Sequence, residues 1–196
     1  MNRWADLSAF ILAGGKSTRM GTDKAFVVLD GSPLLVHALE IAREVAANVS
    51  IVGDPSKFTP FAPTIADIFP NCGPLGGIHA ALRASQNELN LMLAVDMPLV
   101  SPELLQFLIA RARRAPSATA TVPRFGGGWQ PLCAIYRREF ADRAEAALRK
   151  RRYKIDALFD PARTEVVTEE ELQAAGFSAG LFRNLNTPGD LAAACE

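Results

Sequence analysis

The chain has 196 residues, and its 21 lysines and arginines are balanced by 21 aspartates and glutamates, so its formal net charge at pH 7 is zero. This balance gives no bulk electrostatic reason to bind nucleic acid or an anionic membrane, and any anion site has to be local. Hydrophobic residues make up 49% of the sequence, enough for the core of one domain over residues 1–196. The three cysteines suit neither a disulfide framework nor a zinc site, and the apolar segment 7–13 is too short to cross a bilayer. We therefore expect a cytoplasmic protein.

A glycine-rich segment follows the first apolar run. Residues 9–12 have the length and composition of a buried strand, and two adjacent glycines and three cations (Lys16, Arg19 and Lys24) come after it. Glycine lets backbone N–H groups approach phosphate oxygens, and cations neutralise the phosphate charge. By themselves these residues favour a polyphosphate-binding loop and a tight turn with solvated cations about equally.

The next segments predict a strand, a helix and a second strand. Residues 26–29 indicate a short strand closed by a turn, and Ser32 and Pro33 are of the types preferred at the N-cap and first position of a helix. Apolar residues then recur with a 3.6-residue period over 34–45, and residues 49–53 suit a strand. A helix that connects two strands favours a parallel sheet.

Two further segments have candidate functional residues at the ends of predicted strands. A short strand ends at Asp67, and the glycine turn 73–77 then leads into a predicted helix over 78–83, as either a ligand site or a tightly packed turn. Residues 90–95 are nearly continuously apolar, as in a central strand, and are followed by Asp96. Open α/β sheets bind ligands at the carboxyl ends of their strands, so Asp96 is a candidate metal ligand, with a turn or capping aspartate as the alternative.

The second half predicts alternating helices and strands. Ser101 and Pro102 open a helix whose basic end, at residues 111–114, is expected to be solvated. Residues 119–123 and 130–136 suit strands around a glycine turn, and Pro131 indicates either a strand start or a sheet edge that could cover the site.

The remaining segments are helical. Residues 138–152 predict a helix whose terminal cations are more typical of a solvated end than of an anion site, and 168–171 form a capping box. Asn184 and Asn186 precede another helix start and either complete a turn or contact a ligand.

The candidate site lacks an obvious nucleophile. His37 and His79 lie on predicted helices, where packing or surface roles are usual. A bound substrate that attacks a nucleotide phosphate directly needs only positioning and charge neutralisation from the protein, and Mg²⁺ needs only one or two protein carboxylates in such a site.

Taken together, these motifs resemble a known enzyme family. Residues 12–24 are similar to the signature loop of nucleotidyltransferases, and segments 73–77, 95–98, 130–136 and 184–191 follow in the order found in molybdenum cofactor guanylyltransferases. The resemblance covers residues 8–191. It implies a single-domain, Rossmann-like three-layer α/β sandwich with a mostly parallel central sheet, as in nucleotide-diphospho-sugar transferases. Residues 8–100 would bind the nucleotide and residues 101–196 the acceptor.

The resemblance also implies a reaction and partners. GMP would pass from Mg·GTP to the terminal phosphate of molybdopterin or its molybdenum form, giving the guanine dinucleotide and pyrophosphate, with transient docking to molybdenum insertion proteins or molybdoenzyme chaperones. A cytidylyltransferase for the same pterin and a sugar-phosphate nucleotidyltransferase are the alternatives among enzymes. A non-catalytic nucleotide-binding regulatory module is the alternative of a different class.

Site residues follow from the resemblance motif by motif. The catalytic residues would be Arg19 facing the leaving pyrophosphate, Lys24, and Asp96 as the Mg²⁺ ligand. The nucleotide would be bound by Leu12, Ala13, Gly14, Gly15, Lys24, Gly53, Asp67 and Asp96. The acceptor would be bound by Gly77, Gln130, Asn184 and Asn186. One departure is that this chain has Gly53 and Asp54 where the family often has Asn.

Overall fold

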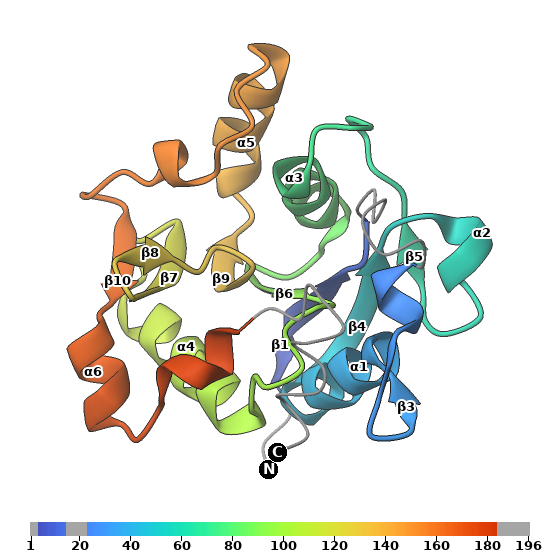
Figure 1. Cartoon of the computed structure of the whole chain (residues 1–196). Helices are drawn as coiled ribbons and strands as arrows, with labels where there is room; N and C mark the ends of the chain where they lie inside the picture. The colour runs from blue at the N-terminus through green and yellow to red at the C-terminus, as the bar shows by residue number, and fades with distance from the viewer. Residues whose placement is uncertain (1–3, 15–22, 184–196) are drawn as a thin grey trace.

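The protein is built on a central β-sheet covered by helices on both faces, as the computed structural model shows for residues 4–14 and 23–183 (Figure 1). The strands are β1 (Trp4–Leu12), β2 (Val28–Leu29), β3 (Ser32–Pro33), β4 (Ala46–Val52), β5 (Thr64–Ile65), β6 (Leu89–Ala94), β7 (Ala120–Phe125), β8 (Gly128–Trp129), β9 (Cys133–Arg137) and β10 (Thr164–Val167). The helices are α1 (Leu34–Val45), α2 (Pro55–Phe58), α3 (Pro74–Ala84), α4 (Pro102–Arg114), α5 (Phe140–Arg149) and α6 (Glu169–Ala174), with 3₁₀ turns η1 (Lys24–Phe26), η2 (Asp156–Leu158) and η3 (Ala179–Phe182).

The sheet is mostly parallel. Its strand order is β10-β7-β9-β6-β1-β4-β5, and β8 pairs with β7. Strand β1 pairs in parallel with β6 on one side and with β4 on the other. Strand β4 in turn pairs in parallel with β5, and β10 pairs in parallel with β7. Within this sheet β9 runs antiparallel to both of its neighbours, β6 and β7. The predicted α/β sandwich is therefore confirmed.

Two separate layers of helix fill the two faces of the sheet. One buried cluster contains Leu35 of α1, Leu105 of α4 and Leu172 of α6, and the other contains Ile78 of α3 and Ala144 of α5. In Figure 1, α3 and α5 lie above the sheet and α1, α4 and α6 below it. Strand β6 between them is buried along its whole length, as expected for a strand covered on both faces.

Several predicted boundaries differ in the structure. Ser32 is not an N-cap: it pairs in the β2–β3 hairpin, and α1 begins at Leu34 without a side-chain cap. The hairpin forms because Asp30 and Gly31 both have positive φ, which suits a tight two-residue turn. Of the predicted strand over 26–29, Val28 and Leu29 form β2, whereas Phe26 ends the 3₁₀ turn η1. Strand β4 begins directly after α1, three residues before the predicted start.

Helix α3 also begins earlier than predicted. It starts at Pro74, which suits the first position of a helix because proline has no N–H to leave unpaired. Gly76 and Gly77 therefore belong to the first turn of the helix rather than to a preceding loop. Gly73 has a φ of 65° at the N-cap, a conformation that glycine adopts without strain.

The prediction of an edge position for the segment around Pro131 is wrong, because β9 lies between β6 and β7. The alternative, a strand start, is confirmed: β9 begins at Cys133, so Pro131 precedes the strand and removes no ladder hydrogen bond. The Ser101 cap and the capping box of Thr168 and Glu171 are both present.

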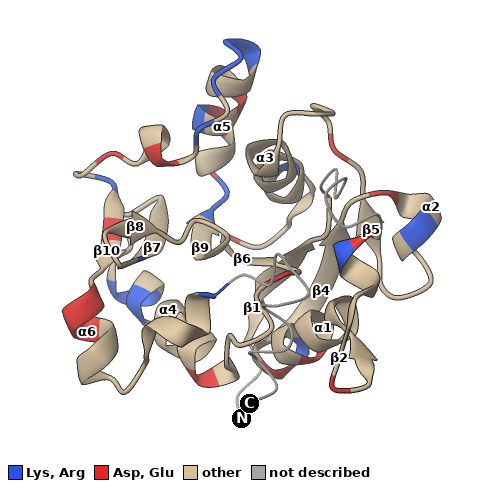
Figure 2. Ribbon diagram, in the orientation of Figure 1, with Lys and Arg blue, Asp and Glu red and all other residues tan. Residues whose placement is uncertain are grey.

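The two basic helix ends have different environments. The end of α4 is not simply solvated, because Arg111 forms ion pairs with Glu165 and Glu171, and Arg113 pairs with Asp6. The cations at the end of α5, residues 149–152, are exposed, as predicted for a solvated helix end (Figure 2). Among the helices of the described residues, none is long and apolar enough to span a membrane.

Candidate active site

The carboxyl ends of the central parallel strands meet at one edge of the sheet and are joined by backbone hydrogen bonds. Ala13 N and Gly14 N donate to Val52 O at 3.0 and 3.1 Å, and Val95 N donates to Leu12 O at 3.2 Å. Gly53 N continues the pattern by donating to Ile65 O at 3.0 Å. The ends of β1, β4, β5 and β6 thus bring together the residues that the sequence placed at four separate strand ends.

Lys24 and Asp96 form an ion pair across this edge. Lys24 Nζ lies 2.8 Å from Asp96 Oδ2, although 72 residues separate the two in the sequence, and both side chains are partly buried. Lys24 begins the 3₁₀ turn η1, and Asp23 caps the turn by accepting a hydrogen bond from Ala25 N at 3.2 Å. Asp96 follows the buried strand β6. The edge therefore carries a cation and a carboxylate side by side, as a site for a metal-bound polyphosphate requires.

Asp67 lies close to the first turn of α3. A Cβ built on Gly77 would be 3.7 Å from Asp67 Oδ1, and 3.4 Å from side-chain atoms of both Leu12 and Val52. Asp67 is half-buried, and this burial raises the pKa of its carboxyl group. A carboxylate that is kept partly away from water and has a perturbed pKa is typical of functional sites.

The two glycines of α3 have different surroundings. A Cβ on Gly76 would lie 2.9 Å from the backbone oxygen of Phe69, so this position is tightly packed. A Cβ on Gly77 would make ordinary or slightly close contacts, and these contacts are with side chains and not with backbone. The packed-turn interpretation of the sequence therefore applies to Gly76, and the ligand-site interpretation stays open for Gly77.

Gly53 ends the adjacent strand with no space for a side chain. A Cβ there would lie 2.8 and 2.9 Å from two ring carbons of Phe58, and a Cβ on Gly14 would approach Gly53 Cα at 3.8 Å. The Phe58 ring thus occupies the space that a side chain at position 53 would need. Any contact that this residue makes with a ligand has to come from its backbone.

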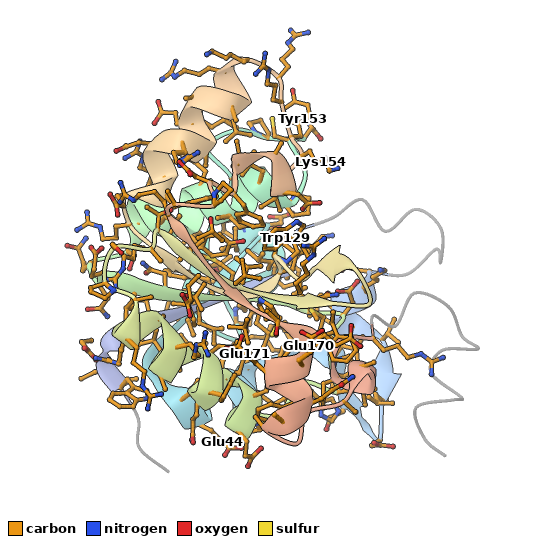
Figure 3. The ribbon with its side chains drawn as sticks, turned by 90° about the vertical axis from the view of Figure 1, so that its left-hand side faces the viewer. Glu44, Trp129, Tyr153, Lys154, Glu170 and Glu171 are labelled. Atoms are coloured by element: carbon orange, nitrogen blue, oxygen red, sulfur yellow. The ribbon has the colours of Figure 1, made fainter. Side chains whose placement is uncertain are left out.

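Gln130 lies in the segment that leads into β9, beside the end of β6. Gln130 N donates to Pro123 O at 2.9 Å, and Ala94 N donates to Leu132 O at 2.8 Å, two residues before Asp96. Trp129 packs on Phe159 with a ring-centroid distance of 4.9 Å, and in Figure 3 it lies between the labelled residues of the α5 side and those of α6. The antiparallel direction of β9 therefore brings its beginning to the edge where the parallel strands end.

Four predicted site residues lie outside the described residues: Gly15, Arg19, Asn184 and Asn186. Of the histidines, His79 is 1% exposed and packs between α3 and α5, and His37 Nε2 lies 2.8 Å from Leu29 O, so the packing interpretation is confirmed for His79.

The sequence analysis missed Asp23, Lys57 and Phe58, which surround Lys24 and Gly53. Asp23 could have been found as a helix-capping residue immediately before Lys24. Phe58 belongs to a helix of only four residues, too short for a periodic pattern.

The residues of the site suit a metal that takes most of its ligands from the substrate. Within residues 4–14 and 23–183 no group of three His, Cys, Asp or Glu side chains could hold an ion on its own. A hard divalent cation bound by phosphate oxygens needs only a single carboxylate such as Asp96.

Comparison with known proteins agrees with this geometry. The family described as MobA-like NTP transferase domain matches residues 9–167. A probable molybdenum cofactor guanylyltransferase of Pelotomaculum thermopropionicum is 34% identical over 92% of this chain and 88% of its own. One from Carboxydothermus hydrogenoformans is 32% identical over 94% and 93%.

Solved structures give the same result. Molybdopterin-guanine dinucleotide biosynthesis protein A from Archaeoglobus fulgidus superposes with a TM-score of 0.83 at 29% identity, covering 95% of this chain and 96% of that one. The fold is shared more widely: a CMP:2-keto-3-deoxy-manno-octonic acid synthetase solved with CTP gives a TM-score of 0.71 at 14% identity, over 96% of both chains. The chain belongs to the MobA-like NTP transferase domain family and is a nucleotidyltransferase.

Proposed function

We propose that this nucleotidyltransferase moves GMP from Mg·GTP to the terminal phosphate of molybdopterin or of its molybdenum form. The relatives named as guanylyltransferases match it over most of both chains. The observation that carries the proposal is the pair of Lys24 and Asp96 at the carboxyl edge, with Nζ and Oδ2 2.8 Å apart. This pair offers a cation for the phosphates and a carboxylate for a metal at one point.

In the proposed reaction an oxygen of the acceptor phosphate attacks the α-phosphorus of GTP. The bond from the α-phosphorus to the bridging oxygen breaks, and pyrophosphate leaves with that electron pair. Asp96 would hold Mg²⁺, which when bound neutralises charge on the phosphates. Lys24 would bind the phosphate oxygens, and Arg19 would face the pyrophosphate. The chain supplies positioning and charge, and no covalent enzyme intermediate is needed.

The two substrates are assigned to different parts of the edge. Residues 12–15 would bind the nucleotide phosphates with their backbone, and Gly53 and Asp67 the nucleoside. Gly77, Gln130, Asn184 and Asn186 would face the acceptor. We place the reaction in the cytoplasm, where thiols such as Cys72 and Cys133 stay free, with handover of the product to molybdenum insertion proteins or molybdoenzyme chaperones.

The direct test offers GTP, CTP, ATP or UTP to the purified chain with Mg²⁺ and molybdopterin. Pyrophosphate release and the dinucleotide product are followed together. We expect turnover with GTP. Turnover with CTP alone would contradict the choice of base and leave the transfer intact, and turnover with none of the four would contradict the transfer itself.

The role of Asp96 gives a second test. Asp96→Asn keeps the size of the side chain but removes the charge that would bind the metal, so turnover should fall at least about 10²-fold while the melting temperature changes little. Glu44→Gln, at an exposed carboxylate near the end of α1, is the matched control and should keep full activity. Near-normal turnover of Asp96→Asn at saturating Mg²⁺ would contradict the assignment.

A further inference from the structure

The residues on both sides of Lys24 in the sequence, Asp23 and Phe26, contact the short helix α2. On one side Asp23 Oδ2 accepts from Lys57 Nζ at 3.1 Å. On the other side the ring of Phe26 stacks on Phe58, with centroids 5.8 Å apart and planes 27° apart. Lys57 and Phe58 are consecutive, so one turn of helix contacts the chain immediately before Lys24 and two residues after it.

Helix α2 is itself fixed to the end of β4. Asp54 accepts from Ser56 N at 2.9 Å and from Ser56 Oγ at 2.7 Å, which caps the helix one residue after Gly53. Phe58 is 2% exposed, and its ring lies so close to Gly53 that a Cβ there would be 2.8 Å away. The ring is therefore enclosed between the sheet and Phe26. In Figure 1, α2 lies beside β5 at the border of the sheet.

We propose that α2 positions Lys24, and that Phe58 is the residue through which it does so. A lysine side chain has a long flexible stem, and holding its ammonium at one point costs conformational entropy. Fixing the backbone on both sides of Lys24 limits where its ammonium can reach, and the observed position is against Asp96. The inference rests on the proposed function, since it treats Lys24 as a ligand of the GTP phosphates.

Phe61 provides a matched control within the same aromatic group. Its ring packs on Phe26 with a centroid distance of 5.9 Å, but it is tilted by 49° and the residue is 37% exposed. Truncation of Phe61 removes a similar ring from the same partner while the buried stack of Phe26 on Phe58 remains. A role specific to Phe58 should be absent from Phe61.

The test is a double-mutant cycle on GTP affinity, measured by calorimetry with Mg²⁺, for Phe58→Ala, Lys24→Ala and their combination. We expect Phe58→Ala to weaken GTP binding about tenfold in the wild-type background and less than about twofold when Lys24 is already alanine, because residues that act through one another are not additive. Phe61→Ala should change affinity less than about twofold in both backgrounds.

Melting curves establish that each variant is folded at the assay temperature. If Phe58→Ala is not folded, Phe58→Leu replaces it in the same cycle. Lys57→Met tests the exposed contact between Lys57 and Asp23. Its effect on GTP affinity should likewise be lost in the Lys24→Ala background. An equal effect of the Phe58 change in both backgrounds, or no effect on GTP affinity in the wild type, would overturn the inference. If the cycle gives either of these results while the wild-type chain still transfers GMP, the inference fails and the proposed function stands. If the wild-type chain transfers no GMP, the proposed function itself is contradicted.

Discussion

Asp67 is a residue whose position is unfavourable for the fold and suitable for a ligand. Its carboxyl group lies half-buried beside Gly77, and burial raises its pKa above the ordinary value of 3.8. A raised folded-state pKa means that stability is fully present below the unfolded value and is lost as the pH rises through the folded value. At neutral pH the ionised Asp67 therefore destabilises the free protein.

Asp67→Asn should consequently raise the melting temperature at pH 7 and weaken GTP binding. The gain in stability should disappear as the pH falls below about 4, where wild-type Asp67 is protonated as well. Thermal melts across this pH range and calorimetry with GTP measure the two effects. A variant that melts lower than the wild type at pH 7 would show that the carboxylate stabilises the fold.

Gly76 and Gly77 allow tight packing and the proposed ligand contact to be tested at adjacent residues. Gly76→Ala should destabilise by about 1–3 kcal/mol, because its Cβ would meet the Phe69 backbone oxygen at 2.9 Å and backbone moves less easily than a side chain. Gly77→Ala should stay within about 1 kcal/mol of the wild type, since alanine favours a helix and its neighbours can shift. Urea unfolding measures both, and a turnover assay should find Gly77→Ala impaired although folded. Full activity of that variant would remove Gly77 from the acceptor site.

At the scale of elements, charged side chains form a joint between α3 and α5. His79 and Arg83 of α3 face Glu145 of α5, with Arg83 Nη2 2.6 Å from Glu145 Oε2 and His79 Nε2 3.4 Å from it. Arg149 completes the group by contacting Glu145 at 2.6 Å. Burial lowers the pKa of His79, and hydrogen bonds from Arg149, Arg83 and His79 lower the pKa of Glu145 to about 2.

This joint should make the protein sensitive to acid. Both folded pKa values are depressed, so their stabilisation is present above the unfolded values of about 6.5 and 4.5 and is lost as the pH falls. Glu145→Gln should melt below the wild type at pH 7, and the difference should shrink as the pH falls from about 4.5 towards 2. Glu44→Gln serves again as the control. A difference that stays constant over this range would show that the loss is one of packing rather than of charge.

At the scale of the whole molecule, much of the fold was predictable because long apolar segments and capping residues are local signals. Asp96 could be predicted since the buried strand β6 precedes it directly, and the cap at Ser101 follows from two adjacent residues. The ion pair of Asp96 with Lys24 depends on strand order, which the local pattern does not contain. The contact of Phe58 with Gly53 depends on a four-residue helix and could not have been predicted.

A metal that is held mainly by the phosphates of the substrate should stabilise the protein only together with the nucleotide. EDTA should therefore stop turnover and leave the melting temperature of the nucleotide-free protein unchanged. Mg·GTP at about 100 times its dissociation constant should stabilise by about 2.7 kcal/mol through binding to the folded state alone. A fall in the melting temperature with EDTA alone would indicate a structural metal.

The reversed strand β9 has a consequence for how such an enzyme can diverge. The residues that we propose to bind the nucleotide come after parallel strands, within β-to-α connections whose length and direction the next helix constrains. Gln130 comes before a strand, in the connection between the antiparallel strands β7 and β9, which leads into β9 and not into a helix. This connection can change in length and composition while the crossover connections stay as they are, so the contacts that we propose for Gln130 with the acceptor can change during evolution while the nucleotide contacts are retained.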